Sequence, residues 1–163
     1  CPLNEITSIA LDYQSRTSVM LVKILAKNFW KIDVEFFDAD EDYIDGISNN
    51  NAGLVIGDRT FNLKDSFLYQ YDLAEEWFKF TKLPFVFACW VANKSLSDEF
   101  KQQFSHALKV GLNHRAHVVA EYTKNKGVTN IDLERYLNEN ISWDFDSQKK
   151  VALKKFISLS RDL

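Results

Sequence analysis

Short apolar runs alternate with segments of helical spacing along the first half of the chain. Apolar runs of strand length cover residues 6–12, 34–39, 52–57 and 83–93. The spacing of apolar residues predicts helices over residues 15–29, 40–48 and 72–82. The run at 52–57 is apolar throughout, as in strands covered on both faces. This alternation predicts an α/β fold with a mostly parallel sheet and helices on its faces.

The pattern changes after Asn93, and the rest of the chain is helical in character. Helices are predicted over residues 97–111, 113–125, 130–138 and 147–160, with breaks near Gly111 and Gly127. The chain therefore divides into a strand-and-helix lobe followed by a helical tail. No internal repeat or low-complexity linker separates the two parts.

Composition and charge narrow the possible functions. Of 163 residues, 46% are hydrophobic and the net charge is −3 without long charged blocks, which argues against binding to nucleic acid or a membrane surface. No apolar run reaches the roughly 18 residues of a membrane span, and no signal peptide is evident. Cys1 and Cys89 are the only cysteines, which indicates a reducing compartment, hence the cytoplasm. Cys89 is expected to be a small buried residue of the strand at 83–93.

Two of the predicted strands end in unusual polar residues, at the edge where parallel sheets bind ligands. After the first strand, Ser15 can cap the next helix, and Thr17 and Ser18 fall in its first turn. Backbone N–H groups and the helix dipole make such a helix start an anion site. Arg16 is unfavourable for the dipole unless an anion binds there, or unless it pairs with Asp12 or Asp58. The alternative is a Ser/Thr-rich cap without a ligand.

The second unusual strand end is Gly57-Asp58-Arg59. Gly57 allows the backbone or a ligand to approach closely, and Asp58 supplies a carboxylate. Alternatively, Asp58 only caps the segment that follows. Spacing alone therefore predicts an α/β lobe with an anion-binding cleft.

Other candidate sites are weaker, and no metal or cofactor is expected. The acidic stretch Asp38–Gly46 has Tyr43 where a calcium loop needs glycine. His114, His117 and Glu121 share a helical face but lack a fourth ligand, so exposed helix polarity is the favoured interpretation. The chain contains no Gly-rich phosphate loop and no G-x-S-x-G elbow.

Four stretches occur in a distinctive order: SRTSVMLVKIL at 15–25, AGLVIGDRTF at 52–61, YDLAEEWFKFTKLPFVFACWVA at 71–92 and ISWDFDSQKKVALKKFISLS at 141–160. Together they resemble the chorismate dehydratase family of the futalosine route to menaquinone. The resemblance implies the type II fold of periplasmic solute-binding proteins, with two lobes joined by crossing strands. Residues 1–86 would then form the α/β second lobe. Residues 87–163 would supply a crossing strand and the helical return portion of the first lobe.

The resemblance implies a cytoplasmic carbon–oxygen lyase whose substrate is the dicarboxylate chorismate and whose site includes Ser15, Arg16, Thr17, Ser18, Gly57 and Asp58. Removal of water would give 3-[(1-carboxyvinyl)oxy]benzoate. The base would be Asp58 or a carboxylate of the substrate. A sister enzyme, 1,4-dihydroxy-6-naphthoate synthase, typically carries His-Glu at Gly57-Asp58 and Thr-Ala at Thr17-Ser18. A non-catalytic solute-binding protein of the same fold is a third possibility. One departure from the dehydratases is the lack of a Pro near Tyr13–Gln14.

Family members are longer at the N-terminus, so the chain resembles a fragment that lacks the first strands of lobe one. We expect such a fragment to be inactive alone. We also expect apolar surface to be exposed along Phe85–Val91, and this surface would promote association.

Overall fold

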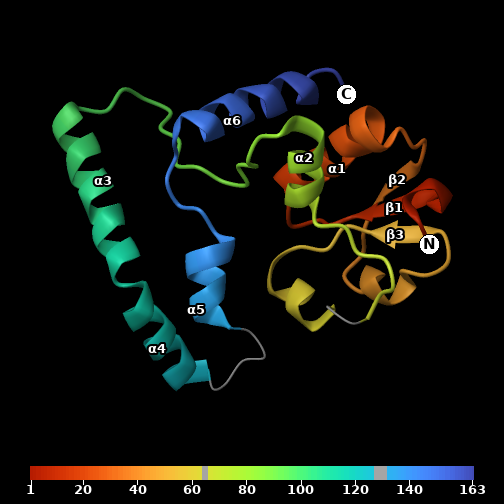
Figure 1. Cartoon of the computed structure of the whole chain (residues 1–163), viewed down its shortest axis with the longest axis horizontal. Helices are drawn as coiled ribbons and strands as arrows, with labels where there is room; N and C mark the ends of the chain where they lie inside the picture. Colours follow the sequence, from red (N-terminus) through yellow and green to blue (C-terminus); the bar gives the residue numbers. More distant parts are fainter. Residues whose placement is uncertain (64–65, 127–131) are drawn as a thin grey trace. The chain divides into compact units, whose positions relative to one another are not determined.

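The computed structural model describes residues 1–63, 66–126 and 132–163 (Figure 1). The chain forms two compact units, the first made of residues 1–88 and 145–163 and the second of residues 89–144. Each is described separately below. The predicted break at Gly127 and the predicted helix start at Asn130 lie outside the described residues. The assignment of residues 1–86 and 87–163 to two lobes of a larger fold stays a prediction.

A three-stranded parallel sheet forms the centre of the first unit. Strand β1 (Ser8–Leu11) lies between β2 (Glu35–Asp38) and β3 (Asn51–Gly53). Ile9 is opposite Phe36 on one side and Ala52 on the other. The predicted α/β class and parallel pairing are confirmed. The third strand is shorter than predicted, because the chain leaves the ladder after Leu54 and turns at Gly57, whose φ of 67° suits glycine.

Three α-helices pack in the same unit: α1 (Arg16–Leu25), α2 (Leu73–Thr81) and α6 (Ser147–Ser160). Side chains of Ser15, Asp72 and Asp146 accept hydrogen bonds from backbone N–H groups in the first turns of these helices. Helix α1 continues as the π-helical turn η2 (Ala26–Trp30). Short 3-10 segments complete the unit: η1 (Leu3–Glu5), η3 (Tyr43–Gly46) and η4 (Gly57–Leu63). The helix predicted over 40–48 is therefore only the turn η3.

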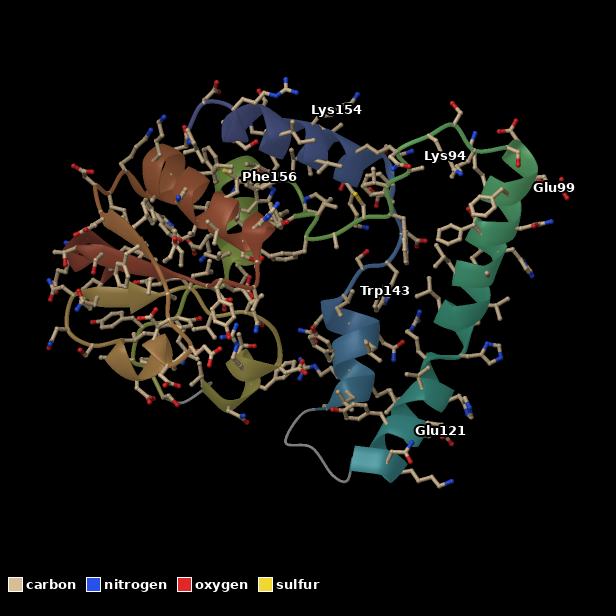
Figure 2. The ribbon with its side chains drawn as sticks, turned by 180° about the vertical axis from the view of Figure 1, so that it is seen from behind. Lys94, Glu99, Glu121, Trp143, Lys154 and Phe156 are labelled. Atoms are coloured by element: carbon tan, nitrogen blue, oxygen red, sulfur yellow. The ribbon has the colours of Figure 1, made fainter. Side chains whose placement is uncertain are left out.

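Helix α1 separates two parts of the hydrophobic core. One of its faces supplies Val22 to a cluster with Ile9, Leu11 and Leu54 from the sheet. Leu21, Ile24 and Leu25 pack with Trp77 of α2. Trp77 is fully buried, and the rings of Phe80, Phe85 and Phe156 meet it edge-on at centroid distances of 5.5–6.3 Å. Figure 2 shows Phe156 on α6. The aromatic cluster therefore attaches both α2 and α6 to the sheet lobe through α1.

Helices are the regular secondary structure found in the described residues of the second unit. It contains α3 (Asp98–Asn113), α4 (Arg115–Lys126), α5 (Leu133–Arg135) and the π-helical turn η5 (Tyr136–Asn140). Ser97 caps α3 as its position predicts, and α3 has no buried residue. Trp143, labelled in Figure 2, donates its indole N–H to the Leu137 carbonyl. The predicted helical character of the tail is confirmed for these residues.

The strand predicted over residues 83–93 is wrong. In the described structure this segment is extended but pairs with no strand. Only its start is packed, where Phe85 contacts Trp77. Cys89 is exposed rather than buried. Trp90 is 77% exposed, and Phe87 and Val91 are exposed as well, so the expected apolar exposure is confirmed for these three residues, whereas Val86 is buried. The apolar run indicated burial, but burial requires neighbours on both faces.

We predict that Trp77→Ala destabilises the first unit strongly. Truncation of a fully buried tryptophan loses aromatic contacts and leaves a cavity, so the free energy of unfolding should fall by about 3–5 kcal/mol. The matched control is Phe78→Ala on the same helix, where the ring is 54% exposed and the change should stay within about 0.5 kcal/mol. Urea unfolding followed by circular dichroism measures both. Equal effects of the two substitutions would contradict this account of the core.

Candidate functional site

A buried carboxylate, Asp12, lies at the carboxyl end of the central strand β1. Its side chain is 0% exposed. The backbone N–H of Gln14 donates to Oδ1 at 2.8 Å, and the backbone N–H of Ile56 donates to Oδ2 at 3.3 Å. These bonds connect the loops that follow β1 and β3. Because the two strands are parallel neighbours, both loops leave the same edge of the sheet.

Two side chains complete the shell around Asp12. Arg59 Nη2 forms an ion pair with Oδ2 at 2.5 Å, and the Tyr43 hydroxyl lies 3.0 Å from the same oxygen. The Tyr43 hydroxyl is also 2.6 Å from the Leu54 carbonyl. Asp12 thus joins β1, η3 and η4 around a single carboxylate.

The shell around Asp12 determines its charge state. Burial by itself would raise the pKa of Asp12, but the hydrogen bonds from the Gln14 N–H, Arg59 and Tyr43 outweigh burial and lower it. Burial and the neighbouring Asp12 carboxylate raise the pKa of the Tyr43 hydroxyl. The hydrogen bond to Asp12 also raises the pKa of Arg59. The group therefore consists of an ionised aspartate, a charged arginine and a neutral tyrosine.

At the start of α1, two of the three hydroxyls bond to each other. The Ser15 hydroxyl accepts a hydrogen bond from the Ser18 N–H at 3.0 Å and donates to the Ser18 hydroxyl at 2.9 Å. Ser18 is 5% exposed. Thr17 is half-buried, and its hydroxyl has no hydrogen-bond partner among the residues that the structure describes. Thr17 is therefore the hydroxyl best able to donate to a ligand.

The remaining predicted site residues are exposed. Arg16 is exposed, and Asp12 pairs with Arg59 instead of Arg16, so the proposed Arg16–Asp12 pair is not formed. Within the described part of the chain, no ion pair joins Arg16 to Asp58 either. Gly57 adopts its left-handed conformation at the start of η4, and Asp58 is exposed beside it. The use of these residues as ligand contacts stays a prediction.

Sequence reasoning named Asp12 only as a possible partner of Arg16, named Arg59 only as part of the strand end Gly57-Asp58-Arg59, and gave Tyr43 no part in the site. Their grouping depends on β3 adding next to β1, which no short motif reveals. The sequence did contain one signal for this grouping, because polar residues directly follow two of the apolar runs. Asp12 follows one run, and Gly57-Asp58-Arg59 follows the other.

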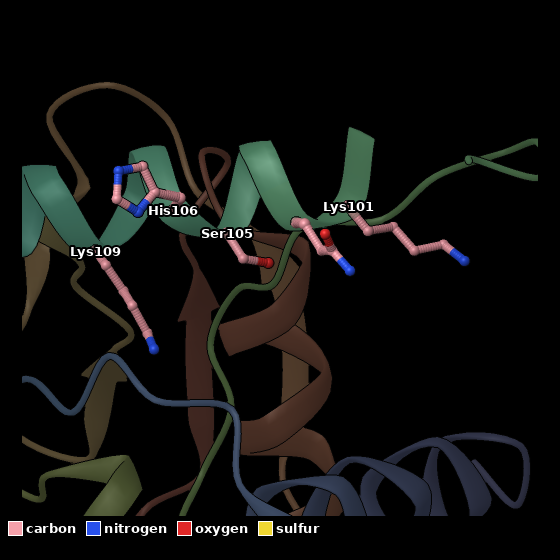
Figure 3. Close-up of a pocket in the computed structure, with 5 residues that line it drawn as sticks. Lys101, Ser105, His106 and Lys109 are labelled. Carbon is pink, nitrogen blue, oxygen red and sulfur yellow. The ribbon is translucent and has the colours of Figure 1, made fainter. Parts of the chain in front are cut away.

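Other clusters form no comparable site. His114, His117 and Glu121 are exposed, and no group of three metal-ligating side chains is found among the described residues; Figure 2 labels Glu121 on α4. The acidic stretch around η3 borders an open hollow beside β2. A second hollow is lined by side chains of α3 alone, which do not converge on one point (Figure 3).

Comparison with known proteins adds a family to this geometry. A family model described as menaquinone biosynthesis matches residues 2–162. The chain belongs to this menaquinone biosynthesis family. It is similar to a chorismate dehydratase of Campylobacter jejuni, with 31% identity over 161 residues, covering 96% of this chain and 60% of that protein. A chorismate dehydratase of Thermus thermophilus is 26% identical over 173 residues, covering 94% of this chain and 63% of the relative.

The chain thus spans about 60% of the length of these curated relatives. In the described part of the chain, no helix combines the length and the apolar composition that a membrane span requires.

We predict that Asp12→Asn lowers stability in a pH-dependent way. At pH 7 the loss should be about 2–4 kcal/mol, because an amide cannot accept the same bonds from Arg59 and the backbone. The folded-state pKa of Asp12 lies below its unfolded value, which is about 3.9. Its contribution is therefore fully present above that unfolded value and disappears as the pH falls through the folded pKa.

Urea unfolding of both proteins between pH 7 and pH 2 measures the effect. The gap between parent and Asp12→Asn should be constant near neutral pH and close in acid. Asp58→Asn is the matched control, because Asp58 is exposed and its loss should change stability by less than about 0.5 kcal/mol. A gap that does not depend on pH would contradict the assignment of the effect to the Asp12 carboxylate.

Proposed function

We propose that the protein containing this chain is a chorismate dehydratase. The observation that carries the proposal is the similarity to two curated chorismate dehydratases over 94–96% of this chain, together with membership of the menaquinone biosynthesis family. The reaction would remove the ring hydroxyl of chorismate and a ring proton as water, leaving 3-[(1-carboxyvinyl)oxy]benzoate. The protein would be a carbon–oxygen lyase of the futalosine route in the cytoplasm, and it would need no cofactor.

The start of α1 suits a carboxylate group of the substrate. Free backbone N–H groups and the positive end of the dipole are found at the start of α1, a helix of 10 residues. The unpartnered Thr17 hydroxyl adds a donor there. In the proposed complex, one carboxylate of chorismate binds at this helix start.

The chemistry requires little from the protein beyond orientation. Loss of water makes the ring aromatic, which supplies much of the driving force, so the site has to hold the substrate and exclude bulk water. The proton acceptor would be Asp58 or a carboxylate of the substrate. We favour the substrate carboxylate, because Arg59 is already paired with Asp12 and Asp58 would repel a dianionic substrate.

The proposed architecture is the two-lobe, binding-protein-like fold, in which the described sheet lobe forms one wall of the cleft. The test below also distinguishes two other functions, the 1,4-dihydroxy-6-naphthoate synthase reaction and ligand binding without catalysis. The whole protein should convert chorismate to a benzoate-type product that absorbs as an aromatic ring, which ultraviolet spectroscopy and mass spectrometry detect. Chorismate binding without turnover would favour a binding protein, and inertness toward chorismate would contradict the proposal.

We predict that Thr17→Ala weakens chorismate binding in the whole protein. It removes a donor to a carboxylate, and such bonds are worth roughly 1.5–3 kcal/mol, so kcat/KM should fall about ten- to a hundred-fold. Stability should not change, because the Thr17 hydroxyl has no partner to lose.

Ser18→Ala is the comparison variant for Thr17→Ala. It removes the acceptor of the Ser15 hydroxyl, so the melting temperature should fall. Any change in kinetics would then accompany a loss of stability. If kcat/KM of Thr17→Ala stays within about two-fold of the parent, the hydroxyls at the start of α1 only cap the helix.

We predict that Asp58→Asn lowers chorismate turnover only modestly. If a substrate carboxylate is the base, the main change should appear in KM. If Asp58 is the base, kcat should fall by roughly 10² or more, the size expected for loss of a general base. Steady-state kinetics with the whole protein decide between the two, and a fall of that size in kcat would overturn our preference.

A further inference from the structure

The guanidinium of Arg59 uses only part of its hydrogen-bonding capacity within the protein. Its Nη2 donates to Asp12 and, at 3.4 Å, to Gln14 Oε1. Nη1 and Nε donate to no group in the part of the chain that the structure describes. The side chain is 29% exposed, so part of it is accessible to a ligand. Arginine has five N–H groups, so three of them remain for another acceptor.

The protein holds this guanidinium in one place. The ring of Tyr13 lies 5.6 Å from its central carbon, and the ring of Tyr43 lies 6.0 Å away on another element. The buried carboxylate of Asp12 fixes its Nη2 end. An arginine that is ordered before binding loses less side-chain entropy when a ligand arrives, so its remaining donors bind more tightly than those of a free surface arginine.

Neutralisation of Asp12 does not by itself explain an arginine here. Asp12 already accepts bonds from the Gln14 N–H, the Ile56 N–H and the Tyr43 hydroxyl. A buried ion pair often adds little net stability compared with an apolar replacement. What the pair does provide is a planar fork of N–H donors, fixed at the carboxyl edge of the sheet beside the loop that leads to α1. Such a fork matches a carboxylate.

We propose that Arg59 binds a carboxylate of the ligand through Nε and Nη1, and that Asp12, Tyr13 and Tyr43 position it for this task. The identity of the ligand as chorismate rests on the function proposed above. Because the Asp12–Arg59 pair is neutral as a whole, the attraction comes from directed N–H donors rather than from excess positive charge. The proposal also gives Arg59 the role for which the sequence suggested Arg16.

The test separates ligand binding from neutralisation of Asp12. In Arg59→Met the buried aspartate loses its cation, so both stability and binding should fall. In the double variant Asp12→Asn/Arg59→Met the buried charge is gone, so stability should recover toward that of Asp12→Asn alone. Binding should not recover: the dissociation constant of the double variant should exceed that of Asp12→Asn about ten- to a hundred-fold. Equal dissociation constants for these two variants would overturn the proposal.

Arg59→Lys provides a second route that does not depend on Asp12→Asn. Lysine keeps a cation for Asp12 but lacks the planar fork, so binding should weaken about ten-fold while the unfolding midpoint stays nearer to that of the parent. Binding as strong as that of the parent would contradict a fork-shaped contact.

Two probes, measured by calorimetry in the whole protein, keep this proposal distinct from the proposed function. One is chorismate, and the other is isophthalate, a stable planar dicarboxylate. If the parent binds isophthalate and the Arg59 variants bind it more weakly, the Arg59 site stands even when chorismate is not converted. If the parent binds neither probe, the Arg59 proposal is wrong.

Discussion

The arrangement of the sheet lobe depends on one constraint: a carboxylate without solvent contact needs partners on every side. Asp12 meets this requirement with donors from the loop after β1, from η3 and from the segment after β3. A buried charge that lost one of these partners would be costly, so the three segments are held in one relative arrangement. The edge of the sheet where ligands bind in parallel folds is therefore also a tightly connected polar region.

The same constraint separates polar groups that serve the fold from groups that remain available. Ser15 and Ser18 bond to each other, and the acceptors of Asp12 are occupied. Among the residues described at this edge, the Thr17 hydroxyl and two nitrogens of Arg59 have no such partner. Both belong to loops or helix starts fixed by Asp12 and its neighbours. Donors held in this way suit recognition of an anion, since their ordering cost is met during folding.

Local signals predicted much of the fold. The helix cap at Ser15, the parallel pairing and the helix at 147–160 all follow from periodicity and capping residues. The strand predicted over residues 83–93 was wrong, because apolar character indicates a preference for burial but does not supply the neighbouring strands that a sheet needs. The hydroxyls of Ser15, Thr17 and Ser18 were predicted as site residues from sequence, whereas the Asp12–Arg59 pair was not predicted. That pair joins residues 47 positions apart, and only sheet order brings them together.

The protonation states at this edge also bear on the chemistry. Asp12 has a lowered pKa and stays ionised near neutral pH, while Tyr43 has a raised pKa and stays neutral. Neither group changes its charge near neutral pH, the range in which a general base would need to accept and release a proton. Under the proposed function, proton acceptance therefore passes to Asp58 or to the substrate itself. A substrate that carries its own carboxylate and becomes aromatic on losing water needs fixed donors more than a titrating side chain, and fixed donors are what this edge of the sheet supplies.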